Sequence, residues 1–298
     1  MKDVSLPLAV GGRRFARIGD FVALTKPRLN FLVVASSAAG YYLGAPTPLD
    51  WTAMMFAVAG TALVAGGAAV LNQVYERDTD ALMRRTRMRP LPDGRVAPPD
   101  ARMFGFTLSV AGLALLAAWS NILAASLALA TLIIYLVVYT PMKRRSSLAT
   151  LVGAVPGALP PLIGWAAARG HVSSGGWALF AIVFLWQIPH FMAIAWLYRD
   201  DYSKAGFPLL PVKEPDGRRT GQQAVVFAMA LLPATLVPAV VGISGFVYAA
   251  TAIVLGGALV WLAVRFAHLR SDAAARQLFL GSITYLPLLW AAMIANRL

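Results

Sequence analysis

Apolar runs of nearly 20 residues recur along almost the whole chain, and a run of that length can cross a lipid bilayer as a helix. We expect spans at 29–45, 51–72, 103–119, 121–140, 147–168, 176–197, 221–241, 243–264 and 275–295. Only 13% of the residues are charged, against about 25% in soluble domains. The sequence therefore predicts an all-α polytopic membrane protein, with nine transmembrane helices in a bundle around a cavity that opens near the cytoplasmic face.

The net charge of +13 could indicate a nucleic-acid partner, but its distribution indicates an orientation in the membrane instead. If the spans alternate in direction, all but two of the 26 Lys and Arg residues fall on one side, the exceptions being Arg169 and Arg297. Basic loops stay in the cytoplasm. We therefore expect a protein of the bacterial inner membrane with a cytoplasmic N-terminus, an external C-terminus and no nucleic-acid partner.

The first 28 residues have no apolar signal-peptide core, so we expect 1–28 to be a cytoplasmic N-terminal segment and 29–298 a single transmembrane domain. The chain has no cysteine, which excludes disulfides and thiolate metal sites.

An acidic motif follows the second predicted span. Asn72, Glu76 and Asp80 are spaced four residues apart, so they share one face if the helix continues. Oxygen-bearing side chains suit Mg²⁺, which prefers carboxylates together with substrate phosphates. Asp78 lies off this face and would join the metal ligands if the helix unwinds there. The spacing predicts a magnesium site, although solvated loop charge is the simpler alternative for one such motif.

A second acidic cluster, with Asp200 and Asp201, follows the sixth span on the same side of the membrane. We interpret the two clusters as the ends of two weakly duplicated four-helix units that face each other across a cavity. Two clusters on one side favour a catalytic role for both over solvated loop charge.

Basic residues follow both acidic clusters. Guanidinium groups bind phosphate bidentately, and the predicted diphosphate ligands are Arg85, Arg89, Lys143, Arg144 and Lys204. Contact with anionic lipid headgroups is the alternative. We favour a phosphate pocket for Arg85 and Arg89, because the first acidic motif immediately precedes them. For the other three residues, flanking charge is an equally good explanation.

These segments together resemble the UbiA-type intramembrane prenyltransferases, over about residues 20–295. The resemblance rests on Asn72-x-x-x-Glu76-x-x-x-Asp80 with 85–91, on Tyr139-Thr140-Pro141-x-Lys143-Arg144 and on 198–202. Segments 157–165, 186–191 and 200–211 resemble the branch of this superfamily that farnesylates haem. Two features depart from the common pattern: Glu76 stands where Asp is more frequent, and the second motif is an Asp-Asp-Tyr run.

The resemblance implies transfer of a farnesyl group from farnesyl diphosphate to a vinyl group of haem B, with Mg²⁺ as cofactor and haem as substrate. A haem A synthase is an implied candidate partner. The resemblance also favours His190 as a haem ligand, since imidazole is a common axial ligand and ionisable groups at membrane depth are usually functional. A structural His190 bonded to a carbonyl freed by Pro189 is the alternative.

The developing allylic cation would need an aromatic shelter, for which Tyr75, Tyr135, Tyr139, Tyr198 and Tyr202 are unranked candidates. Two other functions stay open. One is prenyl transfer to another acceptor, such as 4-hydroxybenzoate. The other, less favoured because the acids cluster at one face, is a membrane transporter.

Overall fold

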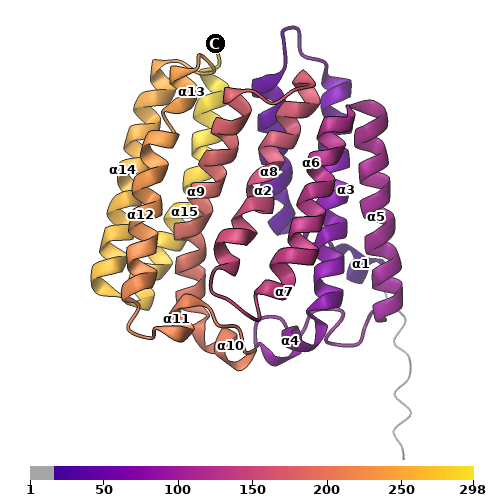
Figure 1. Ribbon diagram of the computed structural model, residues 1–298, viewed down its shortest axis with the longest axis vertical. Coiled ribbons are helices and arrows are strands. Elements are labelled where there is room, and N and C mark those ends of the chain that lie inside the picture. The colour runs from indigo at the N-terminus through magenta and orange to yellow at the C-terminus, as the bar shows by residue number, and fades with distance from the viewer. Residues whose placement is uncertain (1–16) are drawn as a thin grey trace, which may run out of the picture.

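The computed structural model describes residues 17–298 as a bundle of long, roughly parallel helices (Figure 1). Eight helical segments in this part of the chain are long and apolar enough to cross a membrane. A further long helix, α2, is less apolar because its first turn carries Arg28 and Asn30, but it packs inside the same bundle against α8. The all-α multi-pass architecture predicted from the apolar runs is thus confirmed.

The observed spans lie within a few residues of the expected ones. They are α2 (Pro27–Gly44), α3 (Trp51–Tyr75), α5 (Pro98–Trp119), α6 with η1 and α7 (Ile122–Ile133, Ile134–Tyr139, Thr140–Met142), α8 (Ala149–Arg169), α9 (Ser174–Leu197), α12 with α13 (Arg218–Ala234, Val237–Val240), α14 (Phe246–Leu269) and α15 (Asp272–Ala295). Boundaries agree because the hydropathy pattern that sets a span also sets which residues can lie in lipid.

Short helices gather at one end of the bundle, whereas the C-terminus lies at the opposite end (Figure 1). These helices are α4 (Arg77–Leu82), α10 (Arg199–Lys204) and α11 (Leu210–Lys213), and α7 lies with them. A further short helix, α1 (Ile18–Leu24), precedes the bundle. The two acidic motifs belong to α3–α4 and α10, so they lie at the same end.

Close helix contacts depend on small residues. A methyl group added at Gly164 of α8 would lie 1.9 Å from the Ser37 carbonyl oxygen of α2. At Gly112 of α5, an added methyl would lie 2.7 Å from the Gly60 carbonyl oxygen of α3. Small residues allow backbones to approach this closely in membrane bundles, and these contacts pack α2 against α8 and α3 against α5.

Helix α3 does not continue through the acidic motif, contrary to the simplest expectation. It ends at Tyr75, and Glu76 has φ −94° and ψ 9°, outside the helical range. A separate six-residue helix, α4, then carries Asp80. The break changes the direction of the chain, so side chains four residues apart need not share a face after it.

Candidate active site

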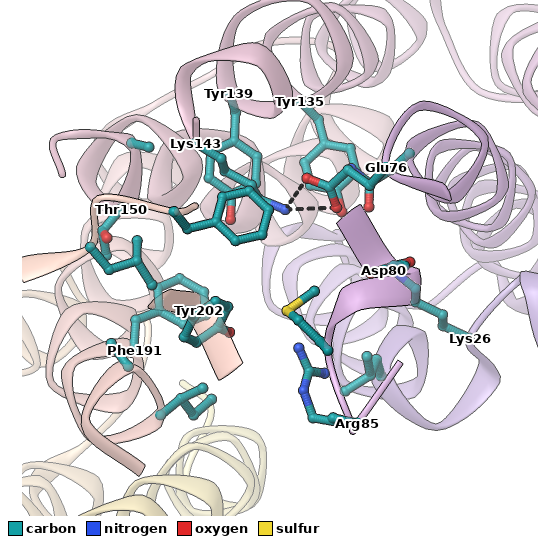
Figure 2. Close-up of a pocket in the computed structure, with 18 of the residues that line it drawn as sticks. Lys26, Glu76, Asp80, Arg85, Tyr135, Tyr139, Lys143, Thr150, Phe191 and Tyr202 are labelled. Carbon is teal, nitrogen blue, oxygen red and sulfur yellow. Dashed lines mark hydrogen bonds and ion pairs between the residues drawn. The ribbon is translucent and has the colours of Figure 1, made fainter. Parts of the chain in front are cut away.

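A pocket of about 200 Å³ lies at the end of the bundle where the acidic motifs meet. Its lining residues come from several segments that are far apart in the sequence: Lys26, Leu29, Asn72, Glu76, Asp80, Met83, Arg85, Arg89, Tyr135, Tyr139, Lys143, Ala149, Thr150, Phe191, Ile194, Ala195, Tyr202, Phe207 and Leu209. Figure 2 shows Glu76, Asp80 and Lys26 on one side, and Phe191, Thr150 and Tyr202 on the other. One wall is therefore charged and the facing wall is largely apolar.

Asn72 is buried at the base of the charged wall, with 1% of its surface exposed. Its Nδ2 donates to Thr140 Oγ1 at 3.1 Å, and Thr140 Oγ1 donates to the Tyr135 carbonyl at 2.7 Å. This hydrogen bond orients the amide and leaves its oxygen, Oδ1, as the atom that can bind a cation. The amide orientation is thus set by a neighbouring helix 68 residues away in sequence.

The acceptor helix is irregular at this point. Between α6 and α7, residues Ile134–Tyr139 form a π-helical segment, a feature often found at functional sites. The segment carries Tyr135 and Tyr139, whose ring centroids lie 5.5 Å apart and which both line the pocket. The Thr140 hydroxyl accepts from one side and satisfies a carbonyl on the other, which ties the irregular turn to α3.

Glu76 forms an ion pair with Lys143. The Lys143 Nζ lies 2.9 and 3.2 Å from the two carboxylate oxygens, as the dashed lines of Figure 2 indicate. The same ammonium lies 4.6 Å from the centre of the Tyr139 ring. Burial alone would lower the pKa of Lys143, but Tyr139 and the Glu76 carboxylate raise it above its ordinary value, so Lys143 carries a positive charge.

Asp80 forms a second ion pair, with Arg89. Arg89 Nη1 lies 2.7 Å from Asp80 Oδ2, and only 2% of the Asp80 side chain is exposed. The buried Thr86 hydroxyl donates to the Asp80 carbonyl at 2.7 Å, which holds the arginine-rich loop between α4 and α5 (residues 83–97) against α4. Glu76 and Asp80, two of the three predicted carboxylate ligands, therefore line the pocket, each paired with a cation also predicted to bind diphosphate.

Arg85 lines the pocket as well, and its guanidinium carbon lies 5.4 Å from the centre of the Tyr198 ring. Arg144 and Lys204 are exposed and do not line the pocket. The structure thus brings three of the five predicted diphosphate ligands together and leaves two at the surface.

The second acidic motif contributes a tyrosine to the pocket instead of the carboxylates that the sequence predicts. Asp200 is exposed, Asp201 is half-buried, and neither lines the pocket. The lining residue from α10 is Tyr202, whose ring packs edge-on against Phe207. A small apolar cluster that includes Met83 and Phe207 connects the two acidic segments across the pocket mouth.

Asp78 does not join the group. Its side chain is 93% exposed and pairs with the neighbouring Arg77 at 3.3 Å, because α4 turns this face to solvent. Of the five tyrosines considered as a cation shelter, Tyr135, Tyr139 and Tyr202 line the pocket. Tyr75 and Tyr198 are 57% and 40% exposed and lie outside it.

His190 lies outside the pocket lining, although Phe191 beside it forms part of the apolar wall. Its ring stacks between Trp186 and Phe279, with centroids 5.2 Å from each. Its Nδ1 lies 2.8 Å from Ser282 Oγ. Because Ser282 Oγ donates to the Phe279 carbonyl at 2.7 Å, the serine accepts from Nδ1–H, which leaves Nε2 unprotonated in the neutral ring.

Within residues 17–298, no three His, Cys, Asp or Glu side chains converge closely enough to hold a metal ion. The oxygens of Asn72, Glu76 and Asp80 nevertheless border one pocket, and an amide with two carboxylates is a donor set that suits Mg²⁺. The residues fit this ion on condition that the two carboxylates leave their present ion pairs.

Sequence reasoning missed Lys26, the residue before α2, which lines the pocket next to the acidic motif. In the sequence it is one of several basic residues that precede the first predicted span. Its position directly before Pro27 at the mouth of that span is the signal that could have singled it out.

Fold and site together define an intramembrane prenyltransferase: residues 33–292 match the UbiA prenyltransferase family, and the chain belongs to it. The resemblance inferred from the motifs is confirmed at this level. In particular, the chain is similar to proteins named protoheme IX farnesyltransferase. That of Solibacter usitatus is 45% identical over 93% of this chain and 98% of the relative. The protein of that name from Koribacter versatilis is 43% identical over 100% of this chain and 99% of the relative.

Solved structures show the same fold at lower identity. A digeranylgeranylglyceryl phosphate synthase gives a TM-score of 0.79 at 16% identity, covering 94% of this chain and 98% of that one. A UbiA homologue from Archaeoglobus fulgidus, bound to GPP and Mg²⁺, gives a TM-score of 0.64 at 16% identity, covering 93% of this chain and 99% of that one.

Proposed function

We propose that this enzyme transfers the farnesyl group of farnesyl diphosphate to a vinyl group of haem B, giving haem O and diphosphate. The similarity of nearly the whole chain to protoheme IX farnesyltransferases carries this proposal. The site supports it, because paired carboxylates and cations lie on one wall of a pocket whose other wall is apolar. That division suits a substrate with a diphosphate head and a hydrocarbon tail.

Mg²⁺ would be held by Asn72, Glu76 and Asp80, and would stabilise negative charge on the departing diphosphate. Relatives of this fold have been seen with Mg²⁺ and a prenyl diphosphate. Asp78, Asp200 and Asp201 would not contact the ion in this arrangement. They would shape the potential around the pocket mouth.

The two ion pairs suggest how the site is loaded. Lys143 and Arg89 bind the Glu76 and Asp80 carboxylates, and a diphosphate would offer both cations alternative oxygen partners. Glu76 and Asp80 would then be free for the metal. Each ligand alone would leave buried charges unpaired, which is costly, so the two should bind together. Arg85 adds a third cation, whereas Arg144 and Lys204 would act at the surface only.

Breaking the allylic C–O bond releases diphosphate and leaves a cation on the farnesyl head. Tyr135, Tyr139 and Tyr202 would stabilise this cation through their ring faces, while Phe191 and the rest of the apolar wall accept the hydrocarbon. A C–C bond then forms with the terminal carbon of the vinyl group. Water adds to the resulting cation beside the porphyrin and loses a proton, which gives the hydroxyethylfarnesyl group.

His190 is the proposed ligand for haem, through Nε2. The bond to Ser282 supports this role, since it fixes the tautomer that presents a lone pair at Nε2, in the way that outer-shell partners orient metal-binding histidines. Haem is the acceptor substrate and needs no redox change in this reaction.

We further propose that the enzyme lies in the bacterial inner membrane with the pocket end in the cytoplasm. The concentration of basic residues at that end supports this orientation. Haem O is too apolar to diffuse through water easily, so we also propose its direct transfer to a haem A synthase, which co-purification can test.

The test is farnesyl transfer by the purified protein in detergent with Mg²⁺ and radiolabelled farnesyl diphosphate. Haem B and 4-hydroxybenzoate are offered in parallel, with the Asp80→Ala variant as control. We expect label on haem B that is lost in the variant. Label on 4-hydroxybenzoate alone would keep the reaction class but overturn the acceptor and the role of His190. Transfer to neither would refute the proposal.

A further inference from the structure

A second pocket lies at the end of the bundle opposite the candidate active site, where α13 and the C-terminus lie (Figure 1). Its volume is about 190 Å³. The lining comes from α2, α8, α9, the link between α13 and α14, and the segment after α15. The proposed transfer reaction makes no use of this pocket, so the residues gathered there require a separate explanation.

Two arginines meet in this pocket. Arg169 of α8 and Arg297, which follows α15, both line it. They are the two basic residues that the predicted topology places on the external side, where such residues are rare. Among the described residues that line the pocket, none has an acidic side chain, and a carboxylate at Leu298 would reduce the positive charge without cancelling it. Like charges held close together repel each other, so the pocket suits an anion.

Capping of α2 explains only part of this arrangement. Arg169 Nε donates to the Gly44 carbonyl at 2.7 Å, and Arg297 Nη2 donates to the Ala45 carbonyl. Carbonyls at a helix C-terminus lack partners within the helix and attract cations. Each guanidinium has five N–H donors, and each also lies over an aromatic ring, with its carbon 5.1 or 4.9 Å from the ring centre. The two groups are thus fixed in place with donors left for a ligand.

The first turn of α9 adds uncharged donors. Ser173, Ser174 and Gly175 line the pocket at the N-terminus of this 24-residue helix. The first N–H groups of a helix have no partner within it and attract anions, and within residues 17–298 the Ser173 hydroxyl caps none of them. Trp165, which packs against Gly175 and lines the pocket, is buried, and its indole N–H has no partner in this part of the chain. Unsatisfied donors therefore accompany the two arginines.

Exposed tryptophans place the pocket at the depth of lipid headgroups. Trp51 begins α3, Trp119 ends α5 and Trp177 lies in the first turn of α9, all at the pocket end of the bundle and all more than half exposed. Tryptophan prefers the membrane–water interface. Val240 and Phe246, on either side of the link that lines the pocket, are 83% and 85% exposed. Acyl chains would find apolar side chains beside a polar pocket.

We propose that this pocket binds the headgroup phosphate of an anionic phospholipid, with Arg169, Arg297 and the first turn of α9 as donors. Guanidinium groups bind phosphate oxygens bidentately, and phosphatidylglycerol carries no positive charge in its headgroup. Phosphatidylethanolamine has the same phosphate, but its ammonium would meet two guanidinium groups and no acidic side chain. The lipid would come from the external leaflet, which follows from the proposed orientation. It would join α2, α8, α9 and the chain after α15.

The test is hydrogen exchange of the full-length protein in an uncharged detergent, followed by mass spectrometry of the peptide that covers 170–177. Phosphatidylglycerol, phosphatidylethanolamine and inorganic phosphate are added separately, and the local readout ignores lipid at the basic cytoplasmic end. At ten times its dissociation constant, phosphatidylglycerol should slow exchange in this peptide by about tenfold. At the same concentration, the other two compounds should slow it by less than about twofold.

Three variants locate the site, with the lipid concentration for half-maximal protection as the measure of affinity. Ser173→Asp keeps a good N-cap for α9 but adds a carboxylate that repels an anion, and Arg169→Gln/Arg297→Gln removes both charges. Arg265→Gln is the matched control, because this exposed guanidinium also lies over a tryptophan ring, but at the cytoplasmic end. Affinity should fall by about tenfold or more in the first two and by less than about twofold in the control.

Equal protection by phosphatidylethanolamine would overturn the proposal, and so would full affinity in Ser173→Asp, whose fold is expected to persist. Protection by inorganic phosphate equal to that by phosphatidylglycerol would overturn the lipid as the source of the phosphate. A loss in Arg265→Gln as large as in the double variant would refute the location. No transfer is measured in these experiments, so failure of farnesyl transfer to haem B would refute the proposed function alone.

Discussion

The Lys143–Glu76 pair joins two segments 67 residues apart, and removing one partner should affect stability and activity in separable ways. In Glu76→Gln, Lys143 would keep its charge without a carboxylate to bind. Only 19% and 11% of the two side chains are exposed. A fully buried pair broken in this way costs about 3–5 kcal/mol, and an exposed pair about 0–1.

For this partly screened pair, we expect Glu76→Gln to lower the free energy of unfolding by about 2–3 kcal/mol. The double variant Glu76→Gln/Lys143→Met removes both charges. Its free energy of unfolding should lie within about 1 kcal/mol of that of the unaltered protein, because no buried charge is left without a partner. Both variants should lose at least about 100-fold in farnesyl transfer, since each lacks a carboxylate that acts on the leaving group.

The assay is denaturant titration in detergent for all four members of the double-mutant cycle, with transfer rates measured on the same preparations. A coupling energy of about 2 kcal/mol would confirm that the pair exists in the empty site. Additive effects, within about 0.5 kcal/mol, would refute the pairing. A double variant with normal activity would refute the role given to Glu76.

Two further predictions test the fold and the extent of the site. Gly164→Ala should destabilise the protein by about 1–3 kcal/mol in denaturant titration, because the added methyl meets the Ser37 carbonyl; Gly257→Ala, which meets nothing within 4 Å, should not, and equal effects would contradict the close contact. Asp78→Asn should keep the transfer rate within about twofold, since its side chain is 93% exposed, whereas Asp80→Asn should lose about 100-fold or more. Equal rates for these two variants would show that the pocket is misassigned.

Much of the fold could be predicted from sequence, because the signals are local. A hydrophobic run of bilayer length identifies a span wherever it occurs, and the observed spans match the expected ones closely. The order of the spans also placed both acidic motifs at one end. Glu76 shows the limit of such reasoning: the shared face expected for the motif depended on a continuous helix, but the helix ends at Tyr75 and a second helix, α4, carries Asp80 to the same pocket.

The sequence by itself determined the all-α membrane architecture, the family and the chemical character of the site: acids for a metal, cations for a diphosphate and apolar helices for a prenyl chain. Tertiary structure decided which of those residues meet. It directed Asp80 inward and Asp78 outward, paired Glu76 with Lys143 and brought Lys26 beside the acids from another segment. The reason is physical. Hydropathy and charge belong to a residue's own segment, whereas the direction of a side chain after a helix break depends on what packs against it.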